Sequence, residues 1–161
     1  MDWIGLGDFV GLGETLKSIT MKEIKYNPNG LPVRVQVNMT GIVFITYRLF
    51  FFGAKVTEEK VLFTETGNNK QPHDDTFILI DPTNPTEPVS NTTDRILLLE
   101  VTVFGIQPND TPFEVSMDFF QKNSNASPEV KIGMSDKIKG NKKLSNNPKT
   151  EFLVVTFKPL P

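Results

Sequence analysis

The chain has no cysteine and only one histidine and one tryptophan among its 161 residues. Without cysteine there can be no disulfide, thiol nucleophile or thiolate metal site. The sequence also lacks a Gly-x-Ser-x-Gly elbow, a His-Glu-x-x-His helix and a Walker loop. The histidine, His73, stands beside Asp74 and Asp75, but side chains adjacent in sequence do not normally converge on one point. We therefore expect a non-enzymatic protein that needs no cofactor and no metal.

A long apolar run and a strong helical pattern are also missing. The first residues carry no basic region, and Asp8 and Glu14 interrupt their apolar stretch. This argues against a secretory signal or a transmembrane segment. We expect synthesis in the cytoplasm, and residence within an assembled particle. Only residues 14–25 have a helical spacing of apolar side chains, and the pattern is short.

The apolar content of 38% and the charged content of 22% are typical of one globular domain. Residues 1–120 carry 9 Lys or Arg and 16 Asp or Glu, whereas residues 121–161 carry 8 and 3. Ends of opposite charge favour head-to-tail contacts between copies. The basic end has lysine but no arginine, so it gives no strong nucleic-acid signal. The candidate basic contact loop comprises Lys137, Lys139, Lys142 and Lys143.

Alternating apolar and polar residues recur along the chain and predict β-strands. Residues 33–40 and 113–119 alternate strictly, which is typical of a strand with one face in water. Residues 42–52 and 96–104 are apolar on both faces, as expected for central strands of a sandwich. Further strands are expected at residues 54–64, 76–81, 129–134 and 151–158.

About eight such strands predict an all-β, antiparallel β-sandwich, and jelly-roll and immunoglobulin-like connections both fit the pattern. Turn residues at 67–69 and 107–110 separate the strands. Residues 135–150 are expected to form a long polar connection before the last strand. Residues 21–161 then make a single sandwich domain, which follows an extended, glycine-rich N-terminal arm at residues 1–20.

The arm contains a tandem hexapeptide, residues 4–9 and 10–15, whose units read aliphatic, Gly, Leu, Gly, acid. Its glycine spacing misses the dinucleotide-binding fingerprint by one residue. In a helix each glycine would cost roughly 1 kcal/mol relative to alanine. As an extended strand, the arm has one aliphatic face and one glycine face that another backbone can approach closely. The candidate assembly residues are Ile4, Gly5, Leu6, Gly7, Phe9, Val10, Gly11, Leu12 and Gly13.

We expect this arm to pack on its own domain or to add to the sheet of a neighbouring subunit. The favoured function is therefore a structural protein that self-associates through sheet edges and the arm into a capsid-, tail- or filament-like particle. The predicted partner is another copy of the same chain.

Two alternative functions stay open. A ligand-binding module would bind a glycan or calcium through loops 66–75 and 81–94. A membrane-active, toxin-like protein would use residues 3–16, although a charge at Asp8 argues against membrane contact. The candidate calcium ligands are Asp74, Asp75, Asp81, Glu87 and Asp94, and the candidate aromatics for a glycan are Trp3 and Tyr26.

Overall fold

The computed structural model describes residues 21–53, 60–70 and 75–161. Along these ranges the chain forms ten β-strands and one 3-10 helix, η2 (Val89–Thr92). The strands are β1 (Lys22–Tyr26), β2 (Arg34–Gly41), β3 (Val43–Phe52), β4 (Val61–Asn68), β5 (Thr76–Ile78), β6 (Ile96–Gly105), β7 (Thr111–Gln121), β8 (Val130–Met134), β9 (Ile138–Lys142) and β10 (Lys149–Pro159).

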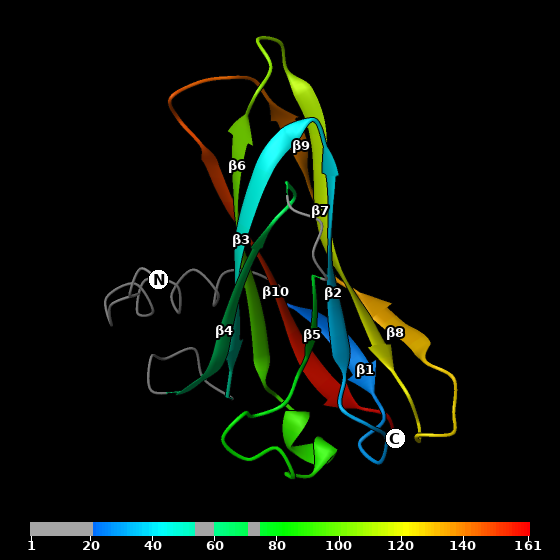
Figure 1. Ribbon diagram of the computed structural model, residues 1–161. Coiled ribbons are helices and arrows are strands. Elements are labelled where there is room, and N and C mark those ends of the chain that lie inside the picture. The colour runs from blue at the N-terminus through cyan, green and yellow to red at the C-terminus, as the bar shows by residue number, and fades with distance from the viewer. Residues whose placement is uncertain (1–20, 54–59, 71–74) are drawn as a thin grey trace.

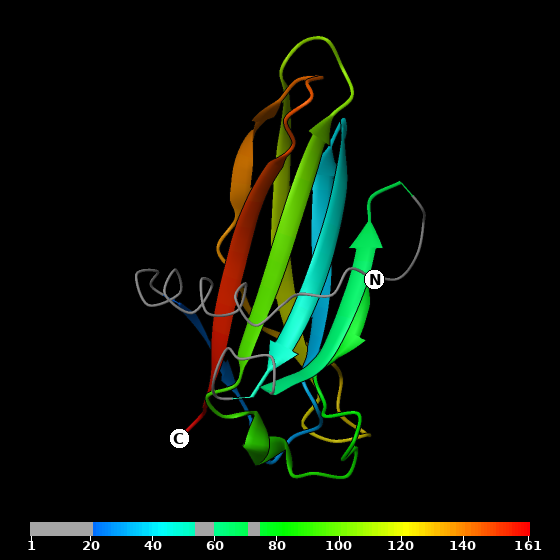
Figure 2. The same ribbon diagram turned by 90° about the vertical axis from the view of Figure 1, so that its left-hand side faces the viewer.

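The strands form two sheets that pack against each other (Figure 1). Sheet I has the order β1-β10-β6-β3-β4, and sheet II has the order β5-β2-β7-β8, with β9 also paired to β7. Among these strands the pairs are antiparallel, except that β1 runs parallel to β10. Figure 2 looks onto sheet I, with sheet II behind it. The predicted all-β sandwich is confirmed.

The core between the sheets follows from the period-two patterns of the sequence. In β2, Val35 and Val37 are buried while Arg34 and Gln36 are partly exposed. The same alternation holds in β7, where residues 113–119 place their apolar side chains against sheet I. Because successive side chains of a strand point to opposite faces, each strand contributes one apolar row to the core.

Two arches carry the chain from one sheet to the other. β2 pairs with β7 in sheet II, and β3 pairs with β6 in sheet I. The β2–β3 and β6–β7 connections therefore cross between the sheets together, as one folded two-stranded ribbon. Gly41 makes the first crossing with φ of +123°, and a Cβ there would lie 2.5 Å from the carbonyl oxygen of Pro112. Only glycine fits this backbone conformation and this close approach.

Two segments differ from their sequence patterns. The short helical spacing of residues 14–25 does not give a helix in its described part, because Ile24 and Tyr26 point into the core from strand β1. The connection expected over residues 135–150 contains β9, which buries Ile138 against the core. Both segments are short and have few apolar residues, so pairing with β10 and β7 decides their conformation.

Candidate interaction surface

The outer face of sheet I points away from sheet II and is organised in rows across β3 and β6 (Figure 2). Every second residue of β3 lies on this face, because Ile45, Leu49 and Phe51 fill the core between the sheets. The rows pair Phe44 with Phe104, Thr46 with Thr102, Arg48 with Glu100, Phe50 with Leu98 and Phe52 with Ile96. The face thus changes along the strands from aromatic through polar to apolar.

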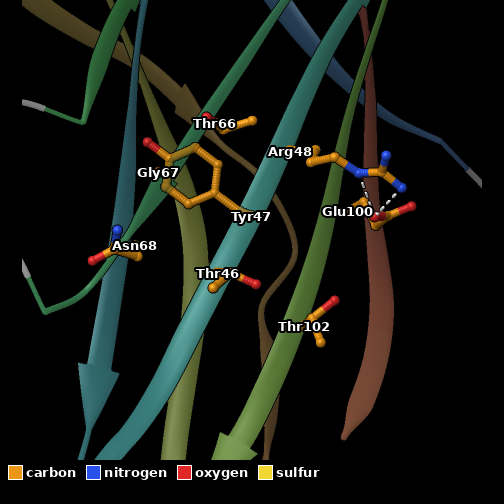
Figure 3. Close-up of a pocket in the computed structure, with 8 residues that line it drawn as sticks. All are labelled: Thr46, Tyr47, Arg48, Thr66, Gly67, Asn68, Glu100 and Thr102. Carbon is orange, nitrogen blue, oxygen red and sulfur yellow. Dashed lines mark hydrogen bonds and ion pairs between the residues drawn. The ribbon is translucent and has the colours of Figure 1, made fainter. Parts of the chain in front are cut away.

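The polar middle of this face is hollowed (Figure 3). The hollow has a volume of about 460 Å³ and includes Thr66 and Asn68 of β4. Nη2 of Arg48 lies 2.7 Å from Oε1 of Glu100, and Nε of Arg48 donates to the same oxygen over 2.8 Å. Both side chains are partly exposed, so this ion pair contributes about 1 kcal/mol or less to stability. The hydroxyl, amide and ionic groups make the hollow suited to polar contacts.

The apolar end of the face forms a second cluster that is separate from the core. Its members are only 0–8% exposed although they lie on the outside of the sandwich. Met21, Val61 and Phe152 are partly buried and pack against it. We call this group the outer cluster: Phe50, Phe52, Ile96, Leu98 and Val154.

The two lateral sides of the sandwich differ in how their edges are covered. On the β1 side, the side chain of Ile24 in β1 packs on the backbone of Gly133 in β8. A Cβ atom placed on Gly133 would lie 3.1 Å from Cδ1 of Ile24. On the β4 side, β4 pairs only with β3 among the described strands, and β5 covers only Arg34 to Gln36 of β2. In the described part of the chain, the outer edges of β4 and β5 therefore have no strand paired to them on the β4 side.

Tyr47 fills the space between the two sheets on the β4 side. Its ring lies against β4 at Gly67, where a Cβ would be 2.3 Å from the Tyr47 hydroxyl oxygen (Figure 3). The hydroxyl donates a hydrogen bond of 2.5 Å to Oδ1 of Asp75, just before β5. Burial, and then the Asp75 carboxylate, raise the pKa of Tyr47 well above its usual range. This hydrogen bond connects the two sheets where no strand pairing does so.

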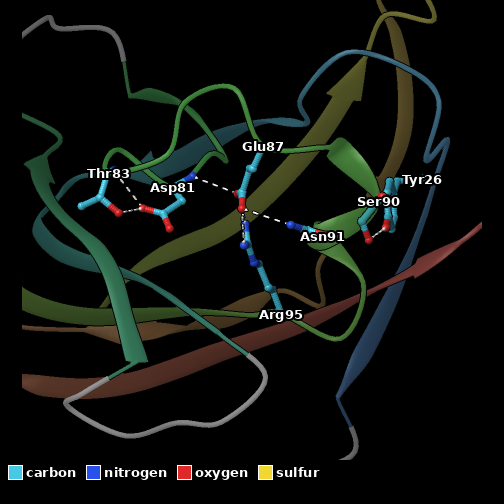
Figure 4. A network of polar contacts seen from close by, with 7 residues as sticks. All are labelled: Tyr26, Asp81, Thr83, Glu87, Ser90, Asn91 and Arg95. Atoms are coloured by element: carbon cyan, nitrogen blue, oxygen red, sulfur yellow. Dashed lines mark hydrogen bonds and ion pairs between the residues drawn. The ribbon is translucent and has the colours of Figure 1, made fainter.

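Residues 79–95, the β5–β6 loop, contain a partly buried ion pair between Glu87 and Arg95 (Figure 4). Nη1 and Nη2 of Arg95 lie 2.5 and 2.9 Å from the two carboxylate oxygens of Glu87. The hydrogen bonds from Arg95 hold the pKa of Glu87 below its usual range. Nearby, the hydroxyl and amide of Thr83 donate to Asp81 and lower the pKa of that carboxyl. These contacts fix the loop rather than leaving its acids open for a ligand.

The same loop reaches β1 on the other side of the sandwich. The hydroxyl of Tyr26 donates to the Ser90 carbonyl over 3.1 Å and lies 2.5 Å from the Thr93 hydroxyl (Figure 4). The amide of Asp94 donates to the Phe157 carbonyl. Tyr26 is fully buried, so its sequence interpretation as a candidate glycan-binding aromatic outside the core was wrong.

The predicted basic contact loop is instead β9 and the residues around it. Lys137 and Lys139 pair with Glu114 at 3.0 and 3.7 Å, and the hydrogen bond from Lys137 lowers the pKa of Glu114. Lys142 donates to the Ser145 hydroxyl, and Lys143 is exposed. Of the four lysines, Lys139 and Lys142 lie in β9, at the edge of sheet II on the β1 side, and Lys137 and Lys143 directly flank this strand.

The predicted assembly arm, Ile4 to Gly13, lies outside the described residues, as do His73 and Asp74. Among the other candidate calcium ligands, Glu87 belongs to the ion pair above and Asp94 pairs with Lys158. No group of three or more His, Cys, Asp or Glu side chains in the described ranges is placed to hold a metal ion. The same ranges contain no helix with the length and hydrophobicity needed to cross a bilayer.

Comparisons of the chain with protein-family models, with curated proteins and with solved structures find no match. The surface must therefore be interpreted from its own chemistry. The sequence interpretation missed the outer cluster, although the signal was present in residues 42–52 and 96–104. A strand of a two-layer sandwich has one outward face, so apolar residues on both faces predict a cover outside the sheet as well as a core inside it.

Proposed function

We propose that the protein is a non-enzymatic structural subunit that self-associates through the edge strands of its β4 side and through its N-terminal arm. The observation that carries this proposal is the contrast between the two edges of sheet I. β4 is eight residues long and carries one charge, Glu65, whereas β1 carries Lys22, Glu23 and Lys25 within five residues. Natural sheets use charges to block edge pairing, and β4 largely lacks them.

Strand addition at β4 would supply main-chain hydrogen bonds, with side chains setting specificity. A contact of β4 with a second β4 gives a closed two-fold dimer, and a contact with a different surface gives a ring or filament. The basic strand β9 lies on the other side of the sandwich, which favours a head-to-tail contact. A capsid-, tail- or filament-like particle is the assembly we favour on this basis.

For the connections of the sandwich we favour the jelly-roll alternative. The folded ribbon of β2–β3 and β6–β7 supports it, since jelly rolls are built from antiparallel strand pairs that pass together from sheet to sheet. The parallel pairing of β1 with β10 would make it a variant of that topology.

Light scattering after size-exclusion chromatography, over a range of concentrations, tests the proposed function. We expect the full chain to form oligomers and the double variant Thr64→Lys, Thr66→Lys to form markedly smaller ones. Two added lysines on β4 oppose pairing of this edge with another strand. Thr66 is exposed and Thr64 is partly buried opposite Phe50, so the stability of the subunit should fall by about 1 kcal/mol, which urea unfolding of the variant checks.

The matched control is Glu23→Lys, which adds a lysine to the β1 edge and should leave the oligomers unchanged. A full chain that is monomeric at every concentration would contradict the proposed function. Oligomers that are unchanged by the β4 variant but become smaller in the β1 variant would show that the subunits associate through the β1 edge, which contradicts the proposed β4 edge.

A ligand-binding module remains the second candidate, because the hollow of about 460 Å³ includes Thr66, Gly67 and Asn68 from the predicted loop 66–75. A melting temperature that rises with added calcium or with a glycan would support this function.

A further inference from the structure

The burial of the outer cluster within a single chain needs an explanation. Phe52 and Leu98 are 0% exposed, and Phe50 is 3% exposed. These side chains point away from sheet II, so the opposite sheet does not cover them. The described residues that pack around the cluster, Met21, Val61 and Phe152, are themselves only partly buried.

We propose that the N-terminal arm, residues 1–20, covers the outer cluster of its own chain. This inference names the docking site of the arm, and in that sense it rests on the proposed function. The exposed fractions are those of a single chain, and its described residues pack against the cluster only through Met21, Val61 and Phe152. The arm is therefore a better candidate to cover the outer cluster than a second copy of the chain or a lipid surface.

The start of the described chain supports this occupant. β1 runs parallel to β10 with Lys22 opposite Val155, so Met21 lies beside Val154, a member of the cluster. Met21 also packs against the cluster. The arm therefore leaves β1 at the border of the apolar surface that it would cover.

The composition and length of the arm fit the site. The cluster spans β10, β6 and β3, which is about 10 Å across at the usual strand spacing. Twenty residues reach several times that distance when extended. The arm supplies glycines that permit close approach to a sheet, and nine large apolar side chains: Met1, Trp3, Ile4, Leu6, Phe9, Val10, Leu12, Leu16 and Ile19.

Covering the cluster also explains why a soluble sandwich tolerates this surface. Burying a Phe or Leu side chain is worth about 1.5–3 kcal/mol relative to exposing it. Left uncovered, the five side chains would form a contiguous apolar patch of the kind that promotes association.

Engineered cysteines test the proposal, because the natural chain has none. Phe152→Cys, at the margin of the cluster, is combined in turn with Leu6→Cys, Leu12→Cys and Leu16→Cys. After mild oxidation of dilute protein, non-reducing electrophoresis separates crosslinks within a chain from crosslinks between chains. We expect at least one pair to crosslink within the chain, several-fold more than the same arm cysteine paired with Phe104→Cys.

Phe104→Cys is the matched control, because Phe104 lies on the same face of sheet I at its opposite, aromatic end and is 38% exposed. Crosslinks only between chains would overturn the proposal and assign the cluster to the arm of a second copy. Crosslinking that is equal at Phe152 and Phe104 would overturn it as well, because it would indicate an arm with no fixed site.

A second measurement keeps the test independent of the cysteine positions. Trp3 is the single tryptophan of the chain and lies in the arm. The double variant Phe50→Ser, Val154→Ser should make Trp3 several-fold more accessible to acrylamide quenching, and Phe104→Ser should not. Quenching of Trp3 that is unaffected by both variants, in protein whose circular dichroism is unchanged, would count against docking. Light scattering on the same samples measures oligomer size separately. The proposed association of subunits and the proposed docking of the arm can therefore be contradicted independently.

Discussion

The two lateral sides of the sandwich are each sealed by a buried tyrosine, but the tyrosines work differently. On the β1 side, Tyr26 reaches neutral groups, the Ser90 carbonyl and the Thr93 hydroxyl, on a loop that packs beside it. On the β4 side, Tyr47 reaches the carboxylate of Asp75 across the space between the sheets.

The difference follows from the surrounding strands. β1 and β8 pack side chain on backbone through Ile24 and Gly133, so the β1 side is closed by ordinary apolar contact. The β4 side combines an edge-on contact between the rings of Tyr47 and Phe77 with one charge-assisted hydrogen bond to Asp75. Because a hydrogen bond to a carboxylate is directional, the stability of this side should be the more sensitive to small changes in geometry.

The largest effect on stability is expected from breaking the ion pair between Glu87 and Arg95. This pair lies in the β5–β6 loop, which runs from β5 on the β4 side to Tyr26 on the β1 side. Arg95→Met should lower the free energy of unfolding by about 1.5–3 kcal/mol, because it removes two hydrogen bonds to the carboxylate of Glu87, which stays charged in a partly buried position. The lowered pKa of Glu87 stabilises the fold above the usual Glu pKa, and this contribution disappears as the pH falls through the lowered value. Urea unfolding at neutral and acidic pH should therefore show a smaller difference between wild type and variant in acid.

An intermediate effect on stability is expected from adding a methyl group at a glycine, and it should differ between the β4 side and the β1 side. Gly67→Ala places a Cβ 2.3 Å from the Tyr47 hydroxyl, whose buried ring cannot move aside, and should cost about 1–3 kcal/mol. Gly133→Ala on the β1 side meets Ile24 Cδ1 at 3.1 Å, and should change stability by less than about 1 kcal/mol. Equal midpoints of urea unfolding for the two variants would remove the contrast between the sides.

The smallest effect comes from removing one hydroxyl on each side. Tyr47→Phe should cost about 1–2 kcal/mol and Tyr26→Phe about 1 kcal/mol at neutral pH. The folded state keeps the proton on Tyr47 where the unfolded state loses it, so wild-type stability should fall as the pH rises above 10.0. Tyr47→Phe should flatten this alkaline decrease, and Tyr26→Phe should retain more of it. Unfolding measured between pH 9 and about 11 decides the point.

The sequence predicts the strands whose apolar rows are long enough to be distinctive. Val33, Val35 and Val37 alternate with polar residues and fix the inward face of β2. β1 and β9 escaped prediction because each has one or two core residues within five positions. Their conformation depends on partners far away in sequence, which a local pattern does not contain.

The candidate site was predictable only in part. The four lysines named from charge alone lie in β9 or directly beside it rather than in a long loop, and two of them, Lys137 and Lys139, pair with Glu114. The pairing of Glu87 with Arg95 depends on the path of a proline-rich loop, which residue types do not specify. Residues 42–52 and 96–104 are apolar on both faces and contain most of the outer cluster. The sandwich hypothesis explains the burial of their inner face only, because no second sheet covers the outer face of sheet I.

The parallel pairing of β1 with β10 joins the first described strand to the last one, with Lys22 opposite Val155 and Tyr26 opposite Pro159. During synthesis, β1 leaves the ribosome long before its partner exists. Sheet I therefore completes its β1 edge only after β10 has been made, more than 120 residues after β1. Non-local pairing of this kind slows folding and extends the period in which a nascent chain can associate wrongly. Loss of residues 155–159 would leave β1 without its neighbour, so Ile24 and Tyr26 reach their buried positions only in a chain that extends through β10.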